Sequence, residues 1–164
     1  MNRTYSIVWN SSRQAWVVAS ELARGHGFVL AKKTLLVLTV ASTIGNSFAQ
    51  NISTGVSIGI TVSDNQYVYD KGQTSNAIVN SGGVQIVHQG GQTTSTTVNS
   101  SGAQNVGNSG TATSTIVSSG GIQRVNSGGT ATGTKLSGGN QNIYSGGKAS
   151  ATEVYAGGTQ TVYL

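Results

Sequence analysis

Apolar and polar positions follow one pattern along the second part of the chain, and this pattern returns about every 19 residues. Each copy has a glutamine, an aliphatic residue two positions later, a glycine four positions after that, and a second aliphatic residue seven positions beyond the glycine. Such a period is typical of a stacked repeat architecture. The glutamines are Gln66, Gln85, Gln104, Gln123, Gln141 and Gln160, and the aliphatic residues after them include Val87, Val106 and Val125.

One copy, Ser81–Asn99, contains two runs suited to β-strands, Val84–His88 and Thr93–Val98. The glycine-rich clusters between them predict turns, because glycine accepts a positive φ without a Cβ clash. A single copy is too short to bury a core, whereas stacked copies cover each other's edges. The pattern therefore predicts an all-β fold, a parallel β-helix or solenoid, with equivalent residues about 4.8 Å apart.

The side-chain parity of the first strand predicts what fills the solenoid. Gln85 shares parity with Val87, so both are expected to point inward. Buried amides are costly unless paired, and stacked amides can bond to one another, so we predict an internal glutamine ladder. The alternative is that the glutamines lie at a corner and face solvent. In the second strand, parity predicts an inward threonine column of Thr96, Thr115, Thr134 and Thr152.

The segment before the repeats predicts a cap. Val56–Val62 alternates, with Val56, Ile58, Ile60 and Val62 on one side, which indicates a single entry strand over the first rung. We therefore divide this part of the chain into a cap region at 50–63 and six repeats at 64–164, the last incomplete. Because no matching cap follows the last repeat, we expect the chain to be a fragment or a truncated reading frame.

Residues 1–49 predict a targeting segment. Lys32-Lys33 precedes an apolar run, Leu35–Ile44, which is about half the roughly 20 residues that a membrane span needs. Ser47–Ala49 supplies a small-x-small cleavage site, so residues 26–49 predict a helical secretory signal that is cut between Ala49 and Gln50. An uncleaved buried helix is the alternative.

The charge distribution excludes several classes of function. The net charge is +5, but five basic residues lie within the first 33 positions, so no basic stripe remains for nucleic acid. The chain has no cysteine, and His88 is the single histidine after the leader. We therefore predict no enzyme, no cofactor and no metal site. The charged residues after Gln50 are Asp64, Asp70, Lys71, Arg124, Lys135, Lys148 and Glu153.

The leader also has an extension, residues 1–25, that a signal peptide does not need. It resembles the extended signal-peptide region of type V secreted proteins, and a chance amphipathic extension is the alternative. The resemblance implies export through the inner membrane of a Gram-negative bacterium by the export machinery. The matching residues are Met1-Asn2-Arg3, Tyr5, Val8-Trp9-Asn10, Trp16-Val17-Val18 and Ser20–Gly25.

The repeats resemble the passengers of AIDA-type autotransporter adhesins and of the antigen-forty-three group. The shared pattern is SGGxQxVxxGGxAxxTxV, as in Ser119–Leu136, and it covers about residues 64–164. The resemblance implies a right-handed β-helix. It also implies transit through the periplasm, and display at the cell surface or outer membrane when the passenger is joined to a C-terminal β-barrel, which we do not find in this chain.

The resemblance further implies adhesion, autoaggregation and biofilm formation, with contacts between copies of the passenger and with a host receptor that the sequence does not name. It also implies a heptosyltransferase partner. Two alternatives remain, a purely structural stalk that presents another domain and a non-functional truncated remnant. The candidate sugar acceptors, chosen for their density of hydroxyl groups, are Thr94, Ser95, Thr97, Ser114 and Thr115.

Overall fold

The computed structural model describes residues 5–10, 15–20 and 50–164. The chain divides into two compact units, Met1–Leu35 and Leu36–Leu164. In the first, β1 (Tyr5–Asn10) and β2 (Ala15–Ser20) pair antiparallel, and their backbone register places Trp9 opposite Trp16. The predicted signal helix and the cut after Ala49 lie outside the described residues. Among the residues that are described, no helix has the length and apolar character to cross a membrane.

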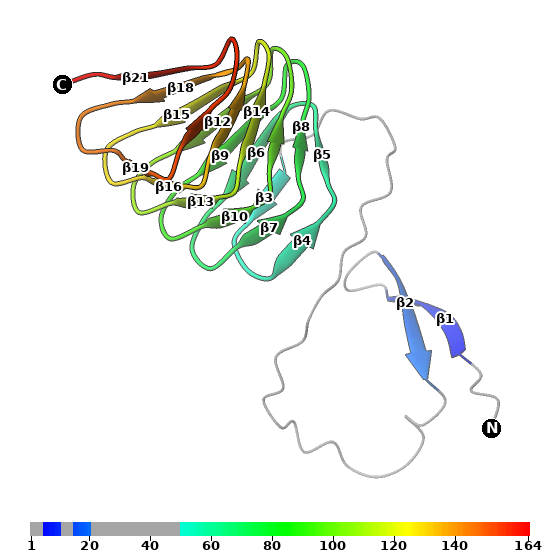
Figure 1. Cartoon of the computed structure of the whole chain (residues 1–164). Helices are drawn as coiled ribbons and strands as arrows, with labels where there is room; N and C mark the ends of the chain where they lie inside the picture. Colours follow the sequence, from blue (N-terminus) through cyan, green and yellow to red (C-terminus); the bar gives the residue numbers. More distant parts are fainter. Residues whose placement is uncertain (1–4, 11–14, 21–49) are drawn as a thin grey trace. The chain divides into compact units, whose positions relative to one another are not determined.

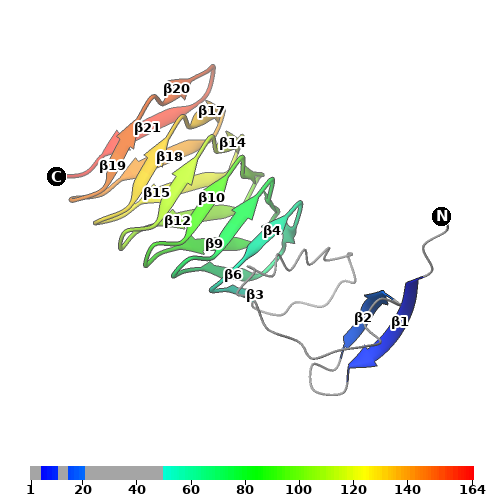
Figure 2. The same ribbon diagram turned by 90° about the horizontal axis from the view of Figure 1, so that it is seen from below.

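The second unit is a β-solenoid in which each turn of the chain, or rung, contributes three short strands (Figure 1). Equivalent strands of successive rungs pair in parallel and form three sheets, which Figure 2 shows from below. Sheet 1 contains β3 (Gln50–Ile52), β6 (Asn65–Val68), β9 (Val84–Val87), β12 (Ala103–Val106), β15 (Ile122–Val125), β18 (Asn140–Ile143) and β21 (Thr159–Val162).

The other two sheets contain six strands each. Sheet 2 contains β4 (Val56–Ile58), β7 (Gln73–Ser75), β10 (Gln92–Thr94), β13 (Thr111–Thr113), β16 (Thr130–Thr132) and β19 (Lys148–Ser150). Sheet 3 contains β5 (Thr61–Val62), β8 (Ile78–Val79), β11 (Thr97–Val98), β14 (Ile116–Ser118), β17 (Lys135–Ser137) and β20 (Glu153–Val154).

The strand register confirms the predicted parallel solenoid. Gln104 lies between Gln85 and Gln123, and Val106 lies between Val87 and Val125. The inward valine and leucine side chains of sheets 1 and 3 are buried between the sheets along most of the solenoid, and Val87, Val98, Val106 and Leu136 have no exposed surface. The right-handed sense of the winding stays a prediction.

Two predicted strands are each divided in the structure. Thr93–Val98 forms β10 and β11, because Ser95 turns the chain with a φ of 56°. Val56–Val62 likewise forms β4 and β5, with Gly59 at a φ of 67°. The prediction that Val56, Ile58, Ile60 and Val62 share one side was therefore wrong, because the bend shifts the alternation. Ile58 is 48% exposed, whereas Ser57 and Ile60 are buried.

The bend between sheets 2 and 3 has a positive φ in every repeat, at Asn76, Ser95, Ser114, Gly133 and Ala151. An L-residue pays about 1 kcal/mol for this conformation and glycine does not. We expect Gly133→Ala to lower the free energy of unfolding by about 1 kcal/mol, because an added Cβ has nothing closer than 3.8 Å and the cost is conformational. Guanidinium unfolding measures this free energy, and Ser119→Ala, at an exposed turn position, is the control. Equal free energies of unfolding for the two variants would contradict the prediction.

Candidate interaction surface

The inner frame of the solenoid is a continuous ladder of glutamine side chains along sheet 1. The Nε2 group of Gln85 donates to Oε1 of Gln66 at 2.7 Å, and Nε2 of Gln104 donates to Oε1 of Gln85 at 2.8 Å. Nε2 of Gln123 continues the series to Oε1 of Gln104 at 2.7 Å. All three donors are fully buried. These contacts confirm the internal ladder and exclude a solvent-facing corner.

The ladder extends one rung further than the sequence pattern indicates. Nε2 of Gln66 donates to Oε1 of Gln50 at 2.7 Å, and β3, β4 and β5 form a complete rung before the first predicted repeat. This rung escaped the sequence analysis because Gln50 lies 16 residues before Gln66 rather than 19. The available sequence signal was Gln50 with an aliphatic residue, Ile52, two positions later, as in the other rungs. Whether this first rung acts as a cap stays a prediction.

A threonine column braces the glutamine ladder from the other side of the core. Oγ1 of Thr96 donates to Oε1 of Gln85 at 3.2 Å, and Oγ1 of Thr115 donates to Oε1 of Gln104 at 3.0 Å. Thr134 and Thr152 make the same contact one and two rungs later. The predicted column is thus confirmed. Within residues 50–164, each buried side-chain nitrogen and oxygen has a hydrogen-bond partner.

With its polar groups satisfied internally, the solenoid presents regular columns of side chains on its outside. On sheet 2, one outer column consists of short hydroxyl residues aligned by the strand register, and Thr132 Oγ1 lies 3.2 Å from Ser150 Oγ. This column contains Ser75, Thr94, Thr113, Thr132 and Ser150.

The structure separates the predicted sugar acceptors by access. Thr94, Ser95 and Ser114 are exposed, and Thr97 is half-buried. Thr115 was a wrong choice, because its side chain is fully buried and its hydroxyl is engaged with Gln104. The error arose because hydroxyl density along the sequence does not distinguish the inward column from its neighbours.

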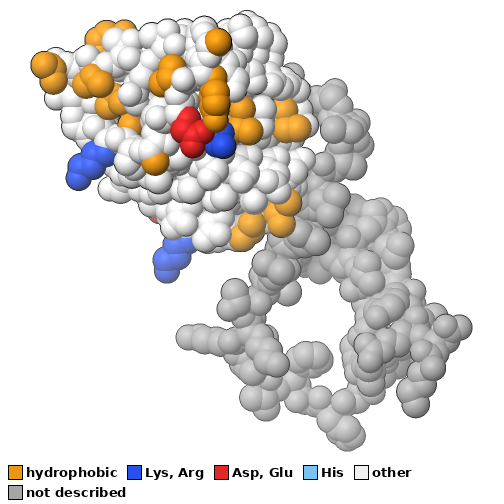
Figure 3. Space-filling model, viewed as in Figure 1, with side chains coloured by type: hydrophobic (Ala, Val, Ile, Leu, Met, Phe, Trp, Pro, Cys, Tyr) orange, Lys and Arg blue, Asp and Glu red, His pale blue; other side chains and the backbone are white. Residues whose placement is uncertain are grey.

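Sheet 3 carries exposed apolar side chains. Ile78 and Ile116 are each 41% exposed and flank Thr97 in one outer column. Figure 3 shows one face of the solenoid, on which charged side chains are sparse and apolar ones are scattered among neutral polar ones. When such a surface contacts a similar one, few charged groups lose their water, so the free-energy cost of desolvation is small.

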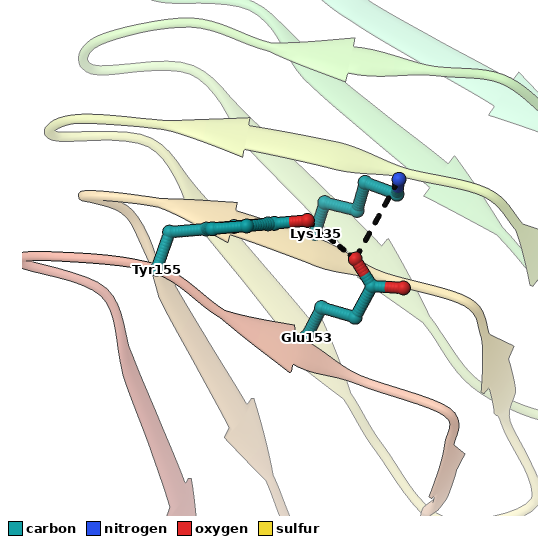
Figure 4. Close-up of polar contacts among 3 residues, drawn as sticks. All are labelled: Lys135, Glu153 and Tyr155. Carbon is teal, nitrogen blue, oxygen red and sulfur yellow. Dashed lines mark hydrogen bonds and ion pairs between the residues drawn. The ribbon is translucent and has the colours of Figure 1, made fainter.

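The same column of sheet 3 ends in a small charged cluster, shown in Figure 4. Nζ of Lys135 lies 3.6 Å from Oε2 of Glu153, and the Tyr155 hydroxyl donates to the same oxygen at 2.5 Å. The Tyr155 hydrogen bond, and then Lys135, lowers the pKa of Glu153, while Glu153 raises the pKa of Tyr155. All three side chains are solvent-accessible, so the cluster contributes little to stability.

The outer face of sheet 1 carries two aromatic groups. The rings of Tyr69 and His88 stack with centroids 5.7 Å apart, and Tyr67 meets His88 edge-on at 6.4 Å. Three rungs beyond His88, Tyr144 and Tyr163 stack at 5.0 Å. In the part of the chain that the structure describes, no three His, Cys, Asp or Glu side chains converge as a metal site would require.

Two family models match separate parts of the chain. Residues 1–50 match the Extended Signal Peptide of Type V secretion system, and residues 59–121 match the Adhesin of bacterial autotransporter system, described as a probable stalk. The chain is also 72% identical over 71 residues to the autotransporter adhesin AIDA-I of Escherichia coli. Over these residues the chain is similar to the N-terminal part of an AIDA-type autotransporter. The match to the extended signal peptide indicates export.

The AIDA-type match covers 42% of this chain and 6% of the length of AIDA-I. Among solved structures, the solenoid is similar to a crystal structure of a TibA fragment hyper-glycosylated by TibC, at 27% identity and a TM-score of 0.37. That match covers 71% of this chain and 66% of the TibA chain.

Proposed function

We propose that residues 50–164 form part of a surface-displayed adhesin passenger that joins cells through contacts between copies, and so promotes autoaggregation and biofilm formation. The observation that carries this proposal is the outer column of sheet 3, where Ile78 and Ile116 are exposed on either side of Thr97. The leader match supports export, and display at the cell surface is the destination we propose. Binding to a host receptor is part of the same proposal.

The sheet 3 column suits contact with a second copy in antiparallel orientation. A two-fold axis through Thr97 would bring Ile78 of one copy against Ile116 of the other, which is the self-complementary arrangement of an isologous interface. Each such contact buries little area, and many copies on two cells add by multivalency. The proposed activity therefore arises from surface contact and needs neither catalysis nor a cofactor nor nucleic acid.

We also propose that a heptosyltransferase modifies the outward hydroxyl groups. The exposed positions Thr94, Ser95 and Ser114 support this part of the proposal, and half-buried Thr97 offers a less accessible acceptor. Sugars on Thr94, Ser95 and Ser114 would lie on sheet 2 and on the bend that follows it, away from the isoleucines of sheet 3. A sugar on Thr97 would instead lie between Ile78 and Ile116 and block the proposed contact. Modification of the first three residues and self-association can therefore occur on the same molecule.

A second function, a stalk that only holds another domain away from the cell, has specific support. The model matching residues 59–121 is described as a probable stalk, and stacked rungs make a stiff column. A stalk needs length and is indifferent to the identity of outward side chains. The two functions are therefore separated by substitutions on sheet 3.

We expect Ile116→Asp to reduce cell clumping severalfold when the chain is displayed as a passenger in front of a translocating β-barrel. The charge would face the apolar column of the opposing copy and remain without a partner. Settling assays of displaying cells measure the effect, with Thr132→Asp on sheet 2 as a control of equal charge. Equal clumping by wild type and both variants would reject self-association through sheet 3 and favour the stalk.

A further inference from the structure

The outer face of sheet 1 combines aromatic rings with one cation, Arg124, which forms no ion pair with any residue that the structure describes. Tyr69 and His88 stack at one end, and Tyr144 and Tyr163 stack at the other. His88 and Tyr144 are three rungs apart in the same column, which is about 14 Å at the usual strand spacing. Flat rings at both ends of a strip with polar side chains between them suit an elongated ligand that has both apolar and hydroxyl faces.

Arg124 lies in the neighbouring outer column, on a rung between those of the two aromatic pairs. Its Nη1 group donates to Oδ1 of Asn105 at 3.4 Å, and Asn142 follows it in the same column. Among the described residues, Arg124 is the one formal charge that faces outward from the strands of sheet 1. Asp64 and Asp70 flank β6, three rungs away. The guanidinium therefore offers donors to an anion from outside the chain.

We propose that this strip, defined by Tyr69, His88, Asn105, Arg124, Tyr144 and Tyr163, binds a uronic-acid-containing polysaccharide that runs along the solenoid axis. The inference rests on the proposed adhesive function and names the chemical class of the receptor. Sugar rings stack on the tyrosines through their C–H faces, and the amide of Asn105 bonds their hydroxyls. A uronate carboxylate pairs with Arg124, whose planar fork matches it.

The charge density of the strip selects between classes of acidic polysaccharide. A heavily sulfated chain carries several anions along this length and needs a cluster of basic side chains. A single arginine flanked by amides instead matches one carboxylate among neutral sugars. Lys71, Lys135 and Lys148, the other basic residues of the solenoid, lie outside the strands of sheet 1.

The test is a calorimetric titration of the purified full chain with a hyaluronan hexasaccharide, in which glucuronic acid alternates with N-acetylglucosamine. A neutral chitin hexasaccharide is the matched ligand. We expect the acidic sugar to bind and the neutral one to bind at least about tenfold more weakly, because it lacks the charge-assisted contact. Arg124→Gln should weaken hyaluronan binding about tenfold, and Tyr144→Ala severalfold. Lys135→Gln, which removes the same charge from sheet 3, should leave the affinity unchanged.

The outcomes separate this inference from the proposed self-association. Absence of hyaluronan binding, equal binding of both sugars, or an equal loss in Lys135→Gln would overturn it. So would an Arg124→Gln variant that dissociates a dimer of the chain without changing sugar affinity, since the strip would then be a contact between copies. If Ile116→Asp leaves clumping intact while Arg124-dependent sugar binding is found, self-association fails and the polysaccharide site stands. Circular dichroism of each variant confirms that the solenoid is folded.

Discussion

Replacing Gln104 with leucine is expected to lower the free energy of unfolding by about 2–6 kcal/mol, although leucine has a similar size. Nε2 of Gln104 donates to Gln85 and to Thr93, and Oε1 accepts from Gln123 and Thr115. Without that oxygen, the Gln123 amide and the Thr115 hydroxyl lose acceptors inside a dry core. Each unsatisfied buried donor costs about 1–3 kcal/mol, and the added apolar surface does not offset both.

The companion variant Gln104→Glu tests the direction of the hydrogen bonds in the ladder, because its stability should depend on pH. A protonated carboxyl group can donate to Oε1 of Gln85 as the amide does, whereas an ionised one places two acceptors together in the core. Burial therefore raises the pKa of this carboxyl above about 4.3, the value of an unfolded glutamate. With the folded pKa raised, stability is full below the unfolded pKa and is lost as the pH rises through the folded pKa.

Denaturant unfolding at several pH values measures both Gln104 variants. Gln92→Glu, at an exposed position of sheet 2, is the matched control and should show no such dependence. The ladder would contribute little to stability if the leucine variant had a free energy of unfolding within about 0.5 kcal/mol of wild type, which is the usual scatter of neutral surface substitutions. A glutamate variant whose stability does not change with pH would lead to the same conclusion.

Gly110→Ala is expected to cost roughly 3 kcal/mol or more, because the added methyl group has no room. A Cβ at Gly110 would lie 2.2 Å from the carbonyl oxygen of Val87 in the rung below. That oxygen also accepts the backbone hydrogen bond from Gly107 at 3.0 Å, so it cannot move aside without breaking the stack. Gly91 and Gly129 have the same close approach, at 2.1 and 2.3 Å.

The informative comparison is with Gly133→Ala, where the cost is conformational and about 1 kcal/mol. Guanidinium unfolding should rank the two variants clearly. Hydrogen exchange should locate the loss of protection in Gly110→Ala at the rungs on either side of the substitution. If the two alanine variants have the same stability, steric contact between rungs is not what requires glycine in this column.

The sequence predicted the parts of the fold that depend on simple periodicity. The recurrence of glutamine and valine predicted the strands of sheet 1 and their parallel stacking. Because inward residues alternate within a strand, the same recurrence predicted the glutamine ladder. The bend at Ser95 was not predicted, since a serine at positive φ leaves no periodic mark. The bend at Gly59 was missed because apolar residues alternate across this glycine without interruption. The sequence analysis assigned the glycines to turns, whereas Gly110 is required because the backbones of neighbouring rungs approach closely there.

The outer surface was predictable only in part. Parity predicted the exposure of Ser95, but it placed Thr94 on the inward side with Thr96. Thr94 is exposed because the bend at Ser95 shifts the alternation. The burial of Thr115 did not enter the choice of acceptors. The pairing of Tyr69 with His88 and of Tyr144 with Tyr163 depends on which residues lie in register between rungs. That register was implicit in the 19-residue spacing, whereas the contacts between rings depend on rotamers that the spacing does not specify.

Rungs differ in length only in their turns, and the hydrogen bonds of the glutamine ladder are the same in shorter and longer rungs. The connection from Ser137 to Asn140 is one residue shorter than that from Ser118 to Ile122, yet Nε2 of Gln141 still donates to Oε1 of Gln123 at 2.6 Å. Gln50 and Gln66 bond across only 16 residues. For a gene, this means that recombination between repeats can lengthen or shorten the product by whole units. Each new junction recreates an existing one, so heritable variation in size need carry no penalty in the core.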